Sequence, residues 1–200
     1  MKRIPFEYAV LAISVGVTFA VATPARAQTS AVTDSKRIET SAEKLARGKY
    51  LVTVAGCNDC HTPWVMGPKG PEPDMSRMLS GHPENEKLPP PPAPQGPWLM
   101  AAAATNTAHS GPWGISYTAN LTPDAETGLG KWTQRNFTET IRTGRHMGRG
   151  RQILPPMPIP MYKHFTDADL EAIFSYLQTI PAVKNRVPEP LPPTLPVAGK

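Results

Sequence analysis

The sequence contains very little cysteine: Cys57 and Cys60 are its only two in 200 residues. A structural zinc site needs about four nitrogen or sulfur ligands, and no second cysteine pair is present to complete one. A disulfide between cysteines this close would close a very small loop and would add little stability. The scarcity therefore argues against a zinc domain and against a scaffold held by disulfides.

Long runs of basic residues are also missing. The 21 Lys and Arg residues exceed the 16 Asp and Glu residues and give a formal net charge of +5, but no basic run is longer than a few residues. Proteins that bind nucleic acid usually concentrate positive charge in a patch or stripe. We therefore expect no nucleic-acid partner. No internal repeat is visible, and strand signals are weak throughout.

Apolar runs long enough to cross a membrane, about 20 residues, are missing beyond the N-terminus. There, Lys2 and Arg3 precede an apolar run over about residues 8–21, and Ala25-Arg26-Ala27 has the pattern of a cleavage site. This order is typical of a secretory signal peptide over residues 1–27, and a retained membrane anchor is the alternative. We expect a periplasmic protein with no transmembrane segment in the mature chain.

Proline, by contrast, is abundant: 25 of the 200 residues, concentrated in residues 63–97 and from Pro181 onward. Because proline donates no backbone hydrogen bond and disfavours helix at the residue before it, both regions should be extended or irregular. The sequence therefore predicts one domain over residues 28–180, with a long proline-rich loop at about 63–116, and a proline-rich tail over 181–200.

Three segments outside these regions have helical signals. Capping residues and helix-ending residues place their limits at Thr40 and Gly56, at Thr133 and Gly144, and at Thr166 and Pro181. Apolar residues in the last segment follow the helical i, i+3, i+4, i+7 spacing. The expected fold class is therefore all-α.

Both cysteines belong to one motif, GCNDCHT, over residues 56–62. Cys57, Cys60 and the adjacent His61 have the spacing of the attachment signature of c-type haem. Two thiols at this spacing can reach the vinyl groups of one porphyrin edge, and the imidazole can bind the iron. We expect one covalent haem c. A thioredoxin-like motif is less suitable, because it is normally found in a βαβ setting and this one follows a helix.

A haem that only transfers electrons needs a second axial ligand, usually methionine or histidine. Met157 and Met161 lie in a proline-stiffened loop before the last helix, where a weak thioether ligand can be held at little entropic cost. His164 is close enough in sequence to compete. The other histidines are expected to be exposed polar residues: His82, His109 and His146.

The order of N-terminal helix, CxxCH motif, methionine loop and C-terminal helix resembles the class I-like c-type cytochromes. It more closely resembles the single-haem cytochrome subunits or partners of bacterial periplasmic dehydrogenases. Four stretches carry the resemblance: RGKYLVTVAGCNDCHTP (47–63), ANLTPDAETGLGKWT (119–133), IRTGRHMGRGRQILPPMP (141–158) and FTDADLEAIFSYLQTIP (165–181).

The resemblance assigns the iron ligands residue by residue. It implies thioether bonds at Cys57 and Cys60 and places His61 as the proximal ligand. The methionine of the family's PxMP element matches Met157, and Met161 falls where the family pattern is variable. Met157 is therefore preferred as the sixth ligand.

Further positions follow from the same resemblance. Family members often have a proline whose carbonyl accepts the proximal histidine's N–H; here Ala119 would supply that carbonyl with less rigidity. Leu121 would pack on the porphyrin ring. Trp132 would donate to a propionate, or it is a core aromatic residue. Between His61 and Ala119 lie 57 residues, where minimal members need about a dozen; this loop could shield the haem edge, form a docking surface or be a mobile insertion.

These observations predict an exported electron-transfer protein rather than an enzyme. Its partners would be redox proteins, with a dehydrogenase as donor and an oxidase or another cytochrome as acceptor. Two alternatives stay open. One is a haem enzyme or gas sensor with a labile sixth ligand, although no acid–base pair near the motif favours it. The other is a thiol–disulfide redox protein.

Overall fold

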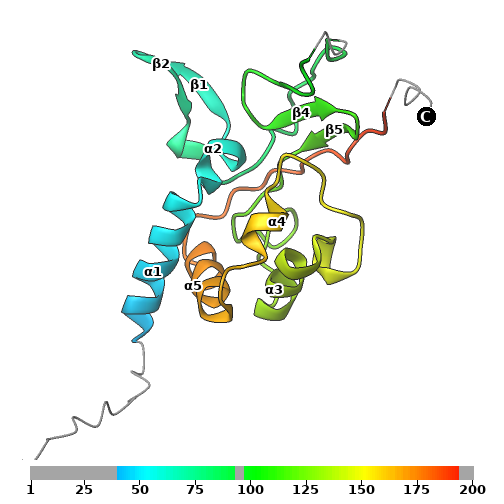
Figure 1. Cartoon of the computed structure of the whole chain (residues 1–200). Helices are drawn as coiled ribbons and strands as arrows, with labels where there is room; N and C mark the ends of the chain where they lie inside the picture. The colour runs from blue at the N-terminus through cyan, green and yellow to red at the C-terminus, as the bar shows by residue number, and fades with distance from the viewer. Residues whose placement is uncertain (1–39, 93–96, 194–200) are drawn as a thin grey trace, which may run out of the picture. The chain divides into compact units, whose positions relative to one another are not determined.

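The computed structural model describes residues 40–92 and 97–193 (Figure 1), and these belong to one unit that begins at Ile38. The expected signal peptide over residues 1–27 lies outside the described residues, as does the end of the expected tail, 194–200. Within the described part of the chain, no helix is long and apolar enough to cross a membrane.

Three main helices form where the sequence predicts them. They are α1 (Ser41–Val54), α3 (Gln134–Thr143) and α5 (Asp167–Leu177). The hydroxyls of Thr40, Thr133 and Thr166 each accept a hydrogen bond from the backbone N–H three residues further on, which satisfies one free donor at each helix start. Gly144 ends α3 in the left-handed conformation, with φ of 67°.

Helix α5 contacts both α1 and α3, as Figure 1 shows. Phe137 of α3 and Phe174 of α5 have ring centroids 5.5 Å apart. On the other side, Gly48 is buried where α1 meets α5, and a Cβ at Gly48 would lie 2.0 Å from the Ala172 carbonyl oxygen. The absence of a side chain at Gly48 therefore lets the two helices approach closely.

One apolar cluster fills the space between the helices, and it is called the core cluster below. Its buried members are Leu51, Val52, Leu79, Leu129, Phe137, Ile141, Tyr162, Leu170, Ile173, Phe174, Leu177 and Ile180. Leu79 comes from the expected loop, and it is fully buried. Part of that loop is therefore built into the core.

Short helices complete the helical part of the fold. They are α2 (Cys57–His61), α4 (Ile159–Tyr162), and the 3-10 turns η1 (Met75–Arg77) and η2 (His146–Gly148). The loop that leads into α4 contains a cis peptide between Pro155 and Pro156. Helices α2 and α4 carry or adjoin the residues of the predicted iron site.

The expectation of an all-α fold was wrong for residues 63–116, which form two small antiparallel sheets. In one sheet, β1 (Trp64–Gly67) pairs with β2 (Gly70–Pro73). In the other, β4 (Ala108–Gly111) pairs with both β3 (Ala101–Ala102) and β5 (Gly114–Tyr117). The remaining architecture is mostly helical.

Both hairpins turn at a sequence of the same pattern, glycine-proline-x-glycine. This pattern is a turn signal even though the strand signals on either side of it are weak. The turn between β1 and β2 reads GPKG, and the turn between β4 and β5 reads GPWG. Proline presets the first turn residue and glycine tolerates the backbone angles that a tight turn requires. The prolines were therefore signals for hairpins as well as for irregular backbone.

The proline-rich tail follows the body as an extended segment, called the strap below, over residues 182–193. Its Leu191 makes two backbone hydrogen bonds with Ile115 of β5, each 2.9 Å long. Further back, the buried Asn185 side chain donates to the carbonyls of Ser80 (2.7 Å) and His82 (2.9 Å). The strap is thus hydrogen-bonded to two parts of the 63–116 segment. One is the stretch that follows the buried Leu79, and the other is strand β5.

The close approach at Gly48 predicts a large effect of a single methyl group. Gly48→Ala should lower the free energy of unfolding by about 2 kcal/mol, because overpacking outweighs the roughly 1 kcal/mol gain in helix propensity. Urea unfolding followed by circular dichroism measures this. The exposed neighbour Lys49 gives the control, since Lys49→Ala leaves the helix contact intact. Equal midpoints for the two variants would contradict the packing described here.

Candidate functional site

Helix α2 carries the whole CxxCH motif directly after α1. Its two cysteines, Cys57 and Cys60, are half-buried and not joined to each other. Burial raises the pKa of the Cys57 thiol to about 11, and burial followed by the nearby Asp59 charge raises the pKa of Cys60. Both thiols are therefore protonated at neutral pH, unlike the low-pKa thiol that initiates thiol–disulfide exchange.

The His61 ring is buried and held by one hydrogen bond. Its Nδ1 lies 2.8 Å from the carbonyl oxygen of Ala119. Because a carbonyl can only accept, the ring proton must be on Nδ1. Burial lowers the pKa of His61, so the ring is neutral at neutral pH. Nε2 then presents a free lone pair, the state in which imidazole binds a metal.

The chain on both sides of Ala119 is fastened to the 63–116 segment. The carbonyl of Thr118 accepts from the backbone N–H of His82 at 3.0 Å, and the N–H of Leu121 donates to the carbonyl of Leu79 at 2.9 Å. These two bonds fix the backbone around the acceptor of the His61 proton. They supply rigidity that the resembled family obtains from a proline at this position.

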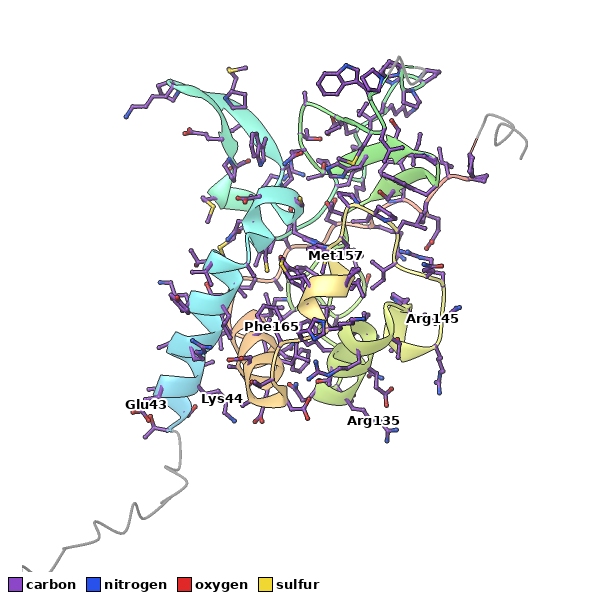
Figure 2. All side chains as sticks on the ribbon, viewed as in Figure 1. Glu43, Lys44, Arg135, Arg145, Met157 and Phe165 are labelled. Atoms are coloured by element: carbon purple, nitrogen blue, oxygen red, sulfur yellow. The ribbon has the colours of Figure 1, made fainter. Side chains whose placement is uncertain are left out.

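Met157 and Met161 occupy different environments. Met157, labelled in Figure 2, is half-buried and packs against the core cluster just before α4. Met161 lies on α4 with 62% of its surface exposed. The hydroxyl of Tyr162 donates to the carbonyl of Ala55. This bond ties the methionine loop and α4 to the residue that ends α1, two positions before Cys57.

Leu121 and Trp132 pack, half-buried, against the same core cluster as Cys57 and Met157. The edge of the Trp132 indole meets the His146 ring, with centroids 5.1 Å apart. These four predicted site residues, drawn from a hundred residues of sequence, thus share one apolar environment. The hydrogen bond from His61 to the Ala119 carbonyl connects the imidazole to the stretch of chain that carries Leu121, since Ala119 lies two residues before it.

The donor set fits a c-type haem. It consists of two neutral thiols, an imidazole with its Nε2 lone pair available, and a thioether among apolar side chains. It does not resemble a zinc or calcium site: in the described ranges, no three His, Cys, Asp or Glu side chains are placed to hold a metal ion.

The expectation of exposed histidines was wrong for two of them. His82 and His109 are 0% and 3% exposed, whereas His146 and His164 are exposed as expected. His109 lies in β4, and Nδ1 of its ring is buried without a hydrogen-bond partner among the described residues. It is close enough to His61 to lower that residue's pKa further. The GPWG turn could have indicated the hairpin that buries His109.

Comparison with known proteins finds dehydrogenase subunits among the relatives of this chain. No protein-family model matches the chain. It is 29% identical over 169 residues, 84% of its length, to a subunit of nicotinate dehydrogenase from Pseudomonas putida. It is 27% identical over 152 residues (73%) to the fructose dehydrogenase cytochrome subunit of Gluconobacter japonicus. It is 31% identical over 130 residues (65%) to the gluconate 2-dehydrogenase cytochrome c subunit of Pantoea cypripedii.

The chain spans only part of each of these longer proteins: 11% of the first, 24% of the second and 22% of the third. The similarity covers most of the present chain, so it concerns the helical unit and its CxxCH motif. The resemblance to cytochrome subunits of bacterial dehydrogenases is confirmed.

The backbone hydrogen bonds on both sides of Ala119 predict that a side chain at Gly81 would weaken the bond between Ala119 and His61. This residue has φ of 78°, and a Cβ there would lie 2.5 Å from the Thr118 carbonyl oxygen and 2.8 Å from that of Ala119. Gly81→Ala should therefore displace the Ala119 carbonyl and expose the His61 ring N–H. Nuclear magnetic resonance of the diamagnetic protein would detect this as faster hydrogen exchange at Nδ1.

Gly70 provides the matched control. It also has a positive φ, 123°, but a Cβ there meets nothing within 4 Å. Gly70→Ala shares the backbone strain and lacks the collision, so its His61 Nδ1–H should exchange as in the wild type. Identical exchange in the two variants would contradict the proposed bracing.

Proposed function

We propose that this chain is a periplasmic c-type cytochrome that carries single electrons on one covalent haem. The family resemblance and the convergence of the CxxCH motif and Met157 on one apolar cluster support this function. Residues 63–116 would be an insertion relative to minimal cytochromes of this type.

The orientation of His61 is the observation that carries the proposal. Its proton is engaged by Ala119 at 2.8 Å, and the backbone around that acceptor is itself hydrogen-bonded. An imidazole fixed in this way keeps one tautomer and one direction for its Nε2 lone pair.

The other residues would have separate tasks. Cys57 and Cys60 would hold the porphyrin as thioethers, and Met157 would bind the iron opposite His61. Leu121 would cover the ring and keep water away from it, and Trp132 would donate to a propionate. When bound, the haem supplies a one-electron couple between ferric and ferrous iron. If His61 and Met157 both bind the iron, it would have no position left for a substrate.

The partners would be redox proteins. Each of the three relatives is named as a dehydrogenase subunit, and two are named as cytochrome subunits. For this chain, a dehydrogenase would be the electron donor, and an oxidase or another cytochrome the acceptor. Export is supported by the charged start, apolar run and small-residue pattern of residues 1–27.

The two alternatives have less support. The raised thiol pKa values are unfavourable for a thiol–disulfide enzyme, which needs a reactive thiolate. A haem enzyme or gas sensor would need an open sixth site, whereas Met157 packs against the same core cluster as Cys57 and Leu121 and would fill that site. Rapid binding of carbon monoxide to the intact reduced protein would favour that second alternative.

The two methionines provide a matched test of the sixth ligand. The oxidised wild type should show the weak methionine–iron band, at roughly 700 nm. Met157→Ala should lose this band and lower the reduction potential, because the thioether favours ferrous iron. Met161→Ala should keep both, since that side chain is exposed. Loss of the band in Met161→Ala alone would reverse the assignment.

A wild-type protein without the band would overturn methionine ligation altogether. In that case His109 would be the residue to test next, because it is buried and lies within electrostatic reach of His61. A His109→Ala variant that then acquires an open sixth site would identify it.

The haem itself is tested by attachment. Pyridine haemochrome analysis should give one haem per chain, and haem staining should persist after denaturation. A Cys57→Ala, Cys60→Ala double variant should lose the stain, because no thioether can form. A wild-type protein with two free thiols and no haem would reject the proposed function.

A further inference from the structure

Strand β5 and the two residues that follow it contact both segments that carry the proposed iron ligands. Beyond its end, Ala119 accepts the His61 proton at 2.8 Å. Within the strand, the Ser116 hydroxyl donates to the carbonyl of Pro155 at 2.6 Å. Pro155 lies two residues before Met157. One short strand therefore connects the two sides of the proposed haem site.

The strand is held along both edges, so it can act as a rigid support. On one edge His109 and Ser110 of β4 pair with Ser116 and Ile115. On the other edge the strap supplies Leu191, which exchanges two backbone hydrogen bonds with Ile115. Figure 1 shows the strap running along β5. The three-stranded sheet β3-β4-β5 leaves this second edge of β5 open, and the Leu191 bridge pairs one residue of it.

The methionine loop has few means of fastening itself. The sequence PPMPIP places prolines at Pro155, Pro156, Pro158 and Pro160, and none of these has a backbone N–H. Backbone hydrogen bonds to these prolines can therefore be made only through their carbonyl oxygens. Within the part of the chain that the structure describes, Ser116 is the only donor from outside the loop to residues 154–157.

From this geometry we propose that Ser116 is a positioning residue for the Met157–iron bond. Its hydroxyl fixes the Pro155 carbonyl to β5, which adds a second tie between the Met157 and His61 segments beside the Tyr162–Ala55 bond. The bond is partly buried: its donor Ser116 is 8% exposed, whereas Pro155 lies at the surface. The inference rests on the proposed function, because it presupposes haem and methionine ligation.

By holding the loop in place, Ser116 would strengthen the bond between the Met157 sulfur and the iron. Methionine is a weak ligand and external bases displace it from ferric iron when its loop moves away. Removing the Ser116 hydroxyl leaves the Pro155 carbonyl without its donor and lowers the cost of that movement. The effect should appear in displacement of Met157 and not in the overall fold.

The test measures how readily imidazole displaces Met157 in the ferric holoprotein. Ser116→Ala should bind imidazole about fivefold more tightly than the wild type, as expected for loss of one partly buried hydrogen bond. Without imidazole, its band at roughly 700 nm should remain. The urea midpoint is recorded in parallel to detect any general loss of stability.

Ser110 gives the matched control on the same hairpin. It lies in β4, is half-buried, and its hydroxyl has no hydrogen bond to another described residue. Ser110→Ala removes an equivalent oxygen and should change imidazole affinity by less than about twofold.

The outcomes separate the inference from the proposed function. Equal imidazole affinities in Ser116→Ala and Ser110→Ala, with the methionine band present in both, would overturn the role of Ser116 and leave the cytochrome assignment intact. A wild-type protein that lacks the band would overturn methionine ligation, and the role of Ser116 with it.

Discussion

The hydrogen bond between His61 and Ala119 is the constraint on which the candidate site depends. It assigns the ring proton to Nδ1, fixes the direction of Nε2 and joins α2 to the residues that lead to Leu121. A single carbonyl orients the imidazole only if that carbonyl cannot move. The backbone bonds from His82 to Thr118 and from Leu121 to Leu79 meet this requirement.

Proline abundance explains why so much of the structure is held by side chains. Proline removes backbone donors, so its neighbours must be fixed through carbonyl oxygens. The Asn185 amide donates to the carbonyls of Ser80 and of His82, which directly precedes Pro83, and the Asn120 amide donates to that of Val183 at 2.8 Å. Ser116 makes the corresponding bond to the methionine loop. Buried amides and hydroxyls therefore replace the missing backbone ladder.

The parts that could be predicted from sequence are those governed by local signals. Thr40, Thr133 and Thr166 identified three helix starts because a capping hydroxyl acts on its own backbone three residues away. The CxxCH motif and the Ala119 acceptor were likewise readable, the second through the family resemblance. Both hairpins have a local signal as well, in their GPKG and GPWG turns, but a proline-rich segment equally predicts irregular backbone.

The burial of His82 and His109 could not be read in the same way. Their environment comes from pairing between distant segments, such as His82 with Thr118, and a single sequence contains no record of that pairing. The same holds for the bond from Ser116 to Pro155, which joins residues 39 positions apart. Local patterns thus predict the helices, while contacts between distant segments decide which polar side chains become buried.

The strap has a consequence for the order of folding. Helices α1, α3 and α5 can form from local signals, but β5 gains its second edge only when Leu191 returns to Ile115 from far along the chain. Loop closure over such distances is slow, and the regions it completes open at lower free energy than a helical core. We therefore expect the axial geometry to be the last feature assembled and the first to open, even while the helical body stays intact.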